Sequence, residues 1–305
     1  MNNLVRILRN ALLLPVFAVC VAVPLAGIAS SRHVKAADQR AVVLLAAGDI
    51  ADCANLSGAE ATAQILEANP GTVAAIGDLA YPDGTREDFK CYDKTWGRVK
   101  NRTRPAPGNH EFHSQGATFY FEYFGEAAGD PKNGFYSYEL GAWHIVSLNS
   151  ECKDIGGCDK GSREEKWLTA DLAAHPAACT LAYFHKPLFS SGGAHGDAPE
   201  VRPLYQALYD ANADVILNGH DHDYERFAPQ DPDGNADPHR GIREFVVGTG
   251  GKNHRPFGPP ESTTEVRDTT AFGILKLTLK SDSYDWQFIP EAGKSFTDSG
   301  SGRCH

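Results

Sequence analysis

The chain has 305 residues, of which 42% are hydrophobic and 22% charged, and this composition excludes a disordered chain, a collagen and a coiled coil. Its formal net charge is −10. Because an acidic surface repels nucleic-acid phosphates and anionic lipids, we expect no nucleic-acid partner. An anionic substrate would need a local positive centre, and a bound metal ion is the obvious candidate.

The first 36 residues differ from the rest of the chain. They contain basic residues but none of the 39 acidic ones, and residues 11–29 are uncharged. This pattern is typical of a secretory signal peptide, cleaved after Ala29 or after Ala36. We therefore predict a secreted or periplasmic protein with no stable membrane association after cleavage. The alternative is an uncleaved N-terminal anchor, since such a stretch can just span a bilayer.

From Ala41 onward, short apolar runs end in polar, glycine-containing motifs, as in AVVLLAAGD, TVAAIGD, TRPAPGNHE, CTLAYFHKP and ADVILNGHDHD. Each run is typical of a buried strand followed by a functional loop. Helical patterns lie between them, with capping-box forms at 57–60 and 162–165 and a helix predicted over 200–212. The alternation of strands and helices predicts an α/β protein.

Other segments are rich in β-structure. Residues 136–148 predict an antiparallel hairpin that turns at Gly141, and FVVGTGG, FGILKLTLK and YDWQFIP add strands near the C-terminus. We therefore predict two sheets, each partly covered by helices. The aromatic run at 119–124 is expected to pack a helix against a sheet rather than to line a substrate site. With no repeat and no long linker, residues 37–305 are predicted to form one domain after the 1–36 leader.

The cysteine count agrees with export, because an even number remains beyond the hydrophobic segment and predicts disulfides. Cys152 and Cys158 flank a short glycine-containing loop, and spacing favours this pair. The other four cysteines leave the pairing open, with Cys53–Cys91 and Cys179–Cys304 as working hypotheses. Free buried thiols are the alternative. No repeated C-x-x-C spacing predicts a cysteine metal site.

Seven polar residues follow the predicted strands directly. Because ligands bind outside the carboxyl ends of strands in α/β sheets, these side chains are expected to converge. They offer oxygen and nitrogen donors without thiolates, a set suited to iron, manganese or zinc. Their number exceeds the needs of one tetrahedral ion, whereas two ions about 3.5–4 Å apart that share a carboxylate would use them all. The seven are Asp49, Asp78, Asn109, His110, His185, His220 and His222.

Five motifs in order resemble the calcineurin-like metallophosphoesterases: GD (48–49), GDLAY (77–81), GNHE (108–111), FHKP (184–187) and GHDHDYER (219–226). Ala51 stands where many members have a histidine, and Tyr81 in the second motif matches the purple acid phosphatase pattern instead. A phenolate is a hard anionic donor that favours Fe(III). The resemblance implies a four-layer α/β/β/α sandwich of two mixed sheets, in a short form without the N-terminal β-domain of the large plant enzymes.

The resemblance also implies a ligand set and a reaction. The first metal, Fe(III), would be held by Asp49, Asp78, Tyr81 and His222, and Asp78 would bridge to a second metal, Fe, Zn or Mn, held by Asn109, His185 and His220. Attack by a metal-held hydroxide in line with the leaving group predicts hydrolysis of small phosphate monoesters, with activity below neutral pH. The alternatives are a phosphodiesterase with the same site and a non-catalytic metal or phosphate binder.

Two histidines are candidate catalytic residues. The resemblance places His110 near the substrate phosphate, where it would stabilise the transition state. His195, in the loop SSGGAHGD, is the candidate acid for the leaving oxygen, and a solvated loop histidine is the alternative. The larger plant-type enzymes carry adjacent histidines where this chain has Ala194 and His195.

Four further residues are candidates for contacts to the metal ligands, because a metal-bound imidazole usually donates its second N–H to an oxygen. Ordinary packing or surface roles are the alternative for each. These candidates are His113, His254, Glu225 and Arg226.

Overall fold

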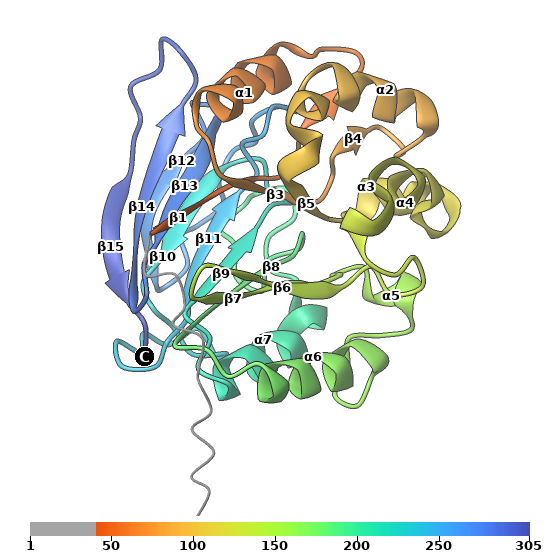
Figure 1. The fold of residues 1–305 in the computed structure, drawn as a ribbon. Coiled ribbons are helices and arrows are strands. Elements are labelled where there is room, and N and C mark those ends of the chain that lie inside the picture. Colours follow the sequence, from red (N-terminus) through yellow and green to blue (C-terminus); the bar gives the residue numbers. More distant parts are fainter. Residues whose placement is uncertain (1–40) are drawn as a thin grey trace, which may run out of the picture. The chain divides into compact units, whose positions relative to one another are not determined.

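The computed structural model of the protein describes residues 41–305, so the predicted leader and its cleavage sites lie outside the described residues. Two large mixed sheets form the centre of this part of the chain (Figure 1). The first sheet contains, in spatial order, β15 (Ser299–Arg303), β14 (Ser283–Pro290), β13 (Gly273–Leu279), β1 (Val42–Ala47), β3 (Thr72–Ile76) and β5 (Thr103–Ala106). The second contains β12 (Thr264–Asp268), β10 (Tyr224–Phe227), β11 (Arg243–Val247), β9 (Val215–Asn218), β8 (Cys179–Tyr183), β7 (Trp143–Ser147) and β6 (Tyr136–Leu140).

The direction of the strands determines where the functional loops lie. In the first sheet β1, β3 and β5 are parallel, and in the second β7, β8, β9 and β11 are parallel. The carboxyl ends of β1, β3 and β5 therefore lie at one edge, as do those of β8 and β9. The predicted hairpin is confirmed as β6 and β7, which pair antiparallel through a turn at Gly141 with a φ of 64°.

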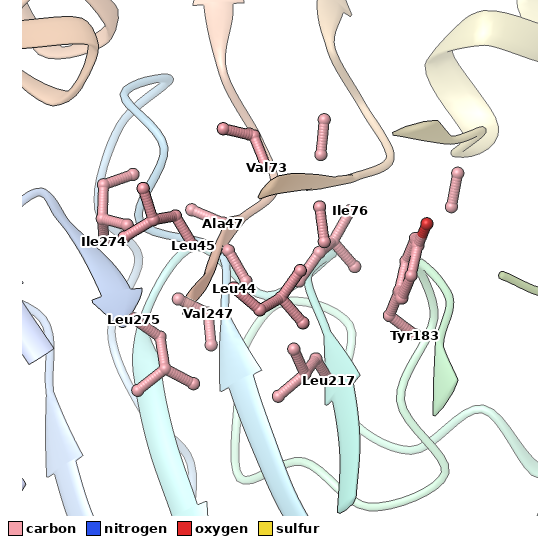
Figure 2. Close-up of a cluster of buried hydrophobic side chains, with 14 of the residues drawn as sticks. Leu44, Leu45, Ala47, Val73, Ile76, Tyr183, Leu217, Val247, Ile274 and Leu275 are labelled. Atoms are coloured by element: carbon pink, nitrogen blue, oxygen red, sulfur yellow. The ribbon is translucent and has the colours of Figure 1, made fainter. Parts of the chain in front are cut away.

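The side chains of the second sheet alternate between two cores. Leu181 and Tyr183 of β8 pack in the core between the sheets, whereas Ala182 and Phe184 pack in the core on the opposite face. This period of two is what a strand buried on both faces requires. Figure 2 shows the inter-sheet core, where Leu44 and Ile76 of the first sheet and Leu217 of the second approach one another with Tyr183.

Helices cover the outer faces of the two sheets. α1 (Ser57–Ala68) packs beside β13, and α6 (Arg163–Ala174) and α7 (Arg202–Asp210) bury Leu168, Leu204 and Leu208 against the second sheet (Figure 1). The predicted four-layer α/β/β/α sandwich is therefore confirmed. The remaining helices are α2 (Arg86–Lys94), α3 (Asn109–His113), α4 (Thr118–Phe124) and α5 (Cys152–Ile155), with 3₁₀ turns at Trp96–Arg102, Gln115–Ala117, Gly125–Ala128 and Pro199–Val201. Two short strands, β2 (Ala51–Asp52) and β4 (Ala80–Tyr81), pair with each other.

Of the two predicted capping boxes the first is absent, and the second is half formed because the Glu165 carboxylate accepts from the N–H of Gly161 (2.8 Å) and not from that of Ser162. Ser57 is the first residue of α1 and not its cap, because the side chain of Asn55 accepts from the Ser57 N–H (3.1 Å) and hydroxyl (2.8 Å). At α6 the hydroxyl of Ser162 does cap the helix by accepting from the N–H of Glu165 (3.2 Å). The helix predicted over 200–212 is present as α7.

The three proposed cysteine pairs are all present as disulfides, Cys53–Cys91, Cys152–Cys158 and Cys179–Cys304. The aromatic run lies in α4, and its residues Tyr120, Phe121 and Phe124 are buried, as the packing prediction required. Among the helices of residues 41–305, none has the length and apolar character needed to cross a bilayer.

Candidate metal centre

The seven predicted ligands, here called the strand-end cluster, lie at the carboxyl ends of strands, and contacts link six of them; Asn109 opens the helix after the third strand end. Asp49 follows β1, Asp78 follows β3, and Asn109 opens α3 after β5. His185 follows β8, and His220 and His222 lie between β9 and β10, while Tyr81 ends β4. The cluster is therefore Asp49, Asp78, Tyr81, Asn109, His185, His220 and His222.

The backbone at three of these positions is unusual for residues with a side chain. Asp49, Asp78 and His220 adopt left-handed φ values of 61°, 50° and 73°. Such conformations cost free energy and gather at functional sites. Each residue follows a glycine, and a Cβ at Gly108 would lie only 2.3 Å from the carboxylate of Asp78. The glycines of the motifs thus give the donors room to face one another.

Three potential metal-ligand atoms surround the hydroxyl of Tyr81, which is a fourth. Its oxygen lies 2.8 Å from Asp49 Oδ1, 3.0 Å from Asp78 Oδ2 and 3.2 Å from Nε2 of His222. The His222 nitrogen is itself 3.3 Å from Asp49 Oδ1. Ligands held about 2.0–2.2 Å from one cation lie at such separations from each other. These four residues can therefore surround one metal ion.

A second group of donors shares one oxygen with the first. Asp78 Oδ2, which contacts Tyr81, also lies 3.1 Å from Nε2 of His185. That nitrogen is 3.1 Å from Nδ1 of His220, and suitable ligand atoms of Asp78, His185 and His220 all lie within 4.8 Å of one another. Because Asp78 belongs to both groups, it has the place of a bridging ligand.

The hydrogen bonds of His185 indicate that this second group can accept a cation. Its Nδ1 faces the carbonyl oxygen of Ile76 (3.0 Å), so this nitrogen carries the proton. Its Nε2 then faces the Asp78 carboxylate, also an acceptor, and only a further proton or a metal ion can lie between them. Although burial opposes it, the charge of Asp78 raises the pKa of His185 to about 10, which expresses the same demand for positive charge.

Asn109 gives an independent test of whether a metal fits. Its side-chain oxygen Oδ1 is buried and has no hydrogen-bond partner among the described residues. Leaving a buried acceptor unpaired costs about 1–3 kcal/mol. Oxygen and imidazole donors without thiolates suit iron, zinc or manganese. The strand-end cluster therefore fits a pair of metal ions.

Glu111, the last residue of the GNHE motif, supports the cluster although the sequence assigned it no role. It is fully buried, and its carboxylate accepts backbone N–H groups of Asp78 (2.9 Å), Leu79 (2.8 Å) and Gly108 (2.8 Å). It thereby joins the loop after β3 to the loop after β5. Burial, together with the nearby charge of Asp78, raises the pKa of Glu111 to about 8.

The residue that orients His222 is Asn253, whose Oδ1 lies 2.9 Å from Nδ1 of that histidine. The proposed contact from His254 is wrong, because its ring stacks on Phe272 with centroids 4.1 Å apart. The sequence prediction of a polar contact shortly after GTGG is correct in place, but the residue that makes the contact is Asn253 and not its neighbour His254. Such a carboxamide can fix the ring orientation of a ligating histidine.

The other three candidates for such contacts also lie elsewhere. Glu225 accepts from Ser191 and Thr264, and Arg226 pairs with Asp298 at 2.7 Å. His113 faces the Pro82 carbonyl and the Asp83 carboxylate. These contacts stabilise neighbouring loops and do not touch a predicted ligand.

The two candidate catalytic histidines flank the cluster on different sides. His110 Nδ1 contacts the carbonyl of Pro82, and its Nε2 lies 3.7 Å from Asp78 Oδ2. His195 stacks on His220 with ring centroids 4.1 Å apart, and its backbone N–H donates to Asp221 (3.3 Å). The Nε2 of His195 accepts from Arg255 at 2.7 Å, a contact that the sequence did not suggest.

A comparison with known protein families identifies the chain. Residues 32–224 match the model of the calcineurin-like phosphoesterases. The chain belongs to this family. Among curated proteins, purple acid phosphatase 15 of Arabidopsis thaliana is 29% identical over 199 residues, covering 53% of this chain and 37% of the relative. Purple acid phosphatase 18 of the same plant is 28% identical over 232 residues, covering 68% of this chain and 50% of the relative.

Solved structures show the same fold. The purple acid phosphatase PPD1 of yellow lupin (Lupinus luteus) superposes with a TM-score of 0.74 at 17% identity, over 87% of this phosphoesterase and 54% of the lupin chain. GAP50, described as an anchor in the inner membrane complex of Plasmodium, has a TM-score of 0.69 at 13% identity, over 87% and 90% of the two chains. The chain spans half or less of the length of the two plant relatives.

Proposed function

We propose that this phosphoesterase is an exported, binuclear metal-dependent hydrolase of small phosphate monoesters. The observation that carries the proposal is the sharing of Asp78 Oδ2 between two groups of donors, one of which contains Tyr81. The similarity to plant purple acid phosphatases supports the same chemistry. When bound, the metal pair would supply positive charge to the phosphate oxygens and would lower the pKa of a water.

The proposed ligands divide between two metal sites that share Asp78. Asp49, Tyr81 and His222 would complete the site that prefers Fe(III), and Asn109, His185 and His220 would complete the site of the second metal, Fe, Zn or Mn. Burial and the carboxylates of Asp49 and Asp78 raise the pKa of Tyr81 well above its usual value. A phenolate at this position would be a hard anionic donor, and such a donor favours Fe(III) over divalent ions.

His110 is proposed to contact the substrate phosphate. Because Nδ1 is used by the carbonyl of Pro82, Nε2 is the nitrogen that faces Asp78 and the metal sites. In the doubly protonated ring, Nδ1–H would stay on that carbonyl and Nε2–H would donate to phosphate oxygens on which charge develops. His195 is proposed as the acid for the leaving oxygen, and this role requires its Nε2 to be released from Arg255.

The experiment compares hydrolysis of 4-nitrophenyl phosphate and bis(4-nitrophenyl) phosphate by one metal-loaded preparation. We expect kcat/KM for the monoester to exceed that for the diester by about tenfold or more, and His110→Ala to lower monoester turnover by about 100-fold. A faster diester reaction would establish a phosphodiesterase. Absence of both reactions in a fully loaded protein would establish a non-catalytic binder.

The preferred metal has a visible signature. With Fe(III) at Tyr81, the oxidised protein should be coloured by a tyrosinate charge-transfer band, and Tyr81→Phe should abolish the band. A colourless protein that contains two irons per chain would refute the Tyr81 assignment. Because water on Fe(III) is more acidic than water on a divalent ion, we expect the highest activity below neutral pH.

Export is proposed from the 1–36 leader and from three disulfides, which form in oxidising compartments. N-terminal sequencing of the protein recovered from outside the cytoplasm should give a start at residue 30 or 37. Recovery of the chain with its native N-terminus in the membrane fraction would support the anchored alternative.

A further inference from the structure

Arg255 lies in the segment 248–258, which follows β11 and borders the strand-end cluster. The backbone N–H of Lys252 donates to the carbonyl of Asp49 (2.9 Å), and that of Arg255 donates to the carbonyl of His222 (3.3 Å). The N–H of Gly193 donates to the carbonyl of Pro256 (3.0 Å) and ties the segment to the loop that carries His195. The segment is thus fixed on both sides of Arg255.

Three cationic side chains lie close to the cluster, and Arg255 differs from the other two. Lys186 pairs with Glu151 at 2.7 Å, and Lys252 pairs with Asp52. Within residues 41–305 Arg255 has no carboxylate partner, and its Nη1 contacts the neutral acceptor Nε2 of His195 instead. A guanidinium that is only partly buried and not neutralised, in a chain of net charge −10, is available to an anion.

The position of Arg255 relative to the proposed ligands limits what it can bind. The imidazole of His195 contacts the guanidinium at its Nε2 and stacks on the ligand His220 at a centroid distance of 4.1 Å. One aromatic ring therefore separates the guanidinium from the donors of the second metal site. An anion bound by the guanidinium would therefore lie beside a phosphate held at those donors.

We propose that Arg255 is a specificity-determining residue that favours phosphate monoesters whose leaving group carries a second anionic group, with carboxylate as the test case. This inference rests on the proposed phosphatase function, since it assumes that the metal pair holds the ester phosphate. The planar guanidinium can bind a carboxylate through two parallel N–H groups, which an ammonium group cannot do.

Equilibrium binding tests the inference without turnover. Phosphonoacetate and ethylphosphonate have a P–C bond in place of the ester bond and are not hydrolysed. Phosphonoacetate carries a carboxylate where ethylphosphonate has a methyl group. Titration calorimetry with the metal-loaded protein should show that phosphonoacetate binds about tenfold more tightly. Arg255→Met should remove this preference, and Arg255→Lys should keep part of it. Equal binding of the two ligands by the native protein, or an intact preference in Arg255→Met, would overturn the inference.

Kinetics gives the second test, with a matched control. Arg255→Met should raise the KM for 3-phosphoglycerate about tenfold more than the KM for glycerol 3-phosphate, because only the former carries a carboxylate. Arg240→Met should change neither KM, since the guanidinium of Arg240 lies over the Tyr209 ring (4.9 Å) at the end of α7. If neither compound is hydrolysed but the native protein prefers phosphonoacetate and Arg255→Met does not, the phosphatase function fails while the role of Arg255 in binding stands.

Discussion

Two groups of histidine and aspartate side chains in this phosphoesterase resemble each other in composition and proximity. One is the strand-end cluster, and the other, here called the His144 cluster, consists of Glu139, His144, Asp171 and His175. In the His144 cluster both ring nitrogens of His144 lie 2.8 Å from carboxylate oxygens, of Glu139 and of Asp171. A hydroxyl, that of Ser137, donates to the second oxygen of Asp171 at 2.8 Å.

The difference between the two clusters lies in their unmet hydrogen bonds. In the His144 cluster each ring nitrogen of His144 and each oxygen of Asp171 has a protein partner. In the strand-end cluster Asn109 Oδ1 has none among the described residues. The residues of the His144 cluster have ordinary backbone geometry, whereas the strand-end cluster contains residues with left-handed φ values. Closely spaced histidines and carboxylates are therefore weaker evidence for a metal ion than a buried potential ligand atom that has no hydrogen-bond partner.

The largest effect is expected for Asp78→Ala, which removes the carboxylate that both donor groups share. Turnover of 4-nitrophenyl phosphate should fall by at least about 1,000-fold. Elemental analysis should show that bound metal falls from two ions per chain to one or none. Unchanged metal content in a folded Asp78→Ala protein would mean that Asp78 is not a ligand.

A large effect of another kind is expected for Asp171→Ala in the His144 cluster. The variant leaves His144, which is 1% exposed, without a carboxylate on Nε2. Loss of a buried partner should lower the free energy of unfolding by about 3 kcal/mol, measured by urea denaturation. Metal content and turnover per folded molecule should equal those of the native protein. A loss of one metal ion in Asp171→Ala would show that the His144 cluster binds metal.

A smaller effect is expected for Asn253→Ala, because Asn253 acts only through His222. Metal affinity at the Tyr81 site should fall by about tenfold, measured by competition with a chelator. Asn253→Asp, which keeps an acceptor for the imidazole N–H, should retain most of the affinity. Equal metal affinity in Asn253→Ala and the native protein would show that Asn253 does not orient His222 for metal binding.

The smallest effect is a pH dependence of stability that arises at a third group of residues, Cys179, Asp214 and Cys304. The two cysteines of this group form a disulfide, and Asp214 pairs with His305. Asp214 lies 3.2 Å from Nδ1 of His305, and this contact raises the pKa of His305. The resulting stability is fully present below about pH 6.5 and is lost as the pH rises through the higher pKa of the folded state. Because His305 is partly exposed, it amounts to less than about 1 kcal/mol.

Thermal unfolding tests this third group. His305→Ala should lower Tm at about pH 5.5 and have little effect at about pH 8.5. The opposite order would contradict the assignment of the pair.

The sequence predicted the parts of the molecule that depend on local pattern. Apolar runs ending in GD, GNHE or GHDHD indicated buried strands and the loops after them, and Asp49, Asp78 and His220 stand where those patterns placed them. The hairpin at 136–148 followed from alternation and a glycine turn. Convergence of the ligands followed from a general rule of α/β sheets.

The parts that the sequence did not predict depend on contacts between distant segments. Asn253 meets His222 only because the segment after β11 crosses the cluster, and no spacing rule separates it from His254. Glu111 reaches the loop after β3 through backbone N–H groups, which leave no mark in the residue pattern. The start of α1 is a local failure of prediction, because the side chain of Asn55, two residues before Ser57, accepts from the Ser57 N–H.

The central claim is that the strand-end cluster holds two metal ions bridged by Asp78. The most direct measurement is anomalous diffraction from a crystal of the metal-loaded protein. The account predicts one peak among Asp49, Tyr81 and His222 and another among Asn109, His185 and His220, with Asp78 between them. A single peak, or a peak in the His144 cluster with none at the strand ends, would contradict it.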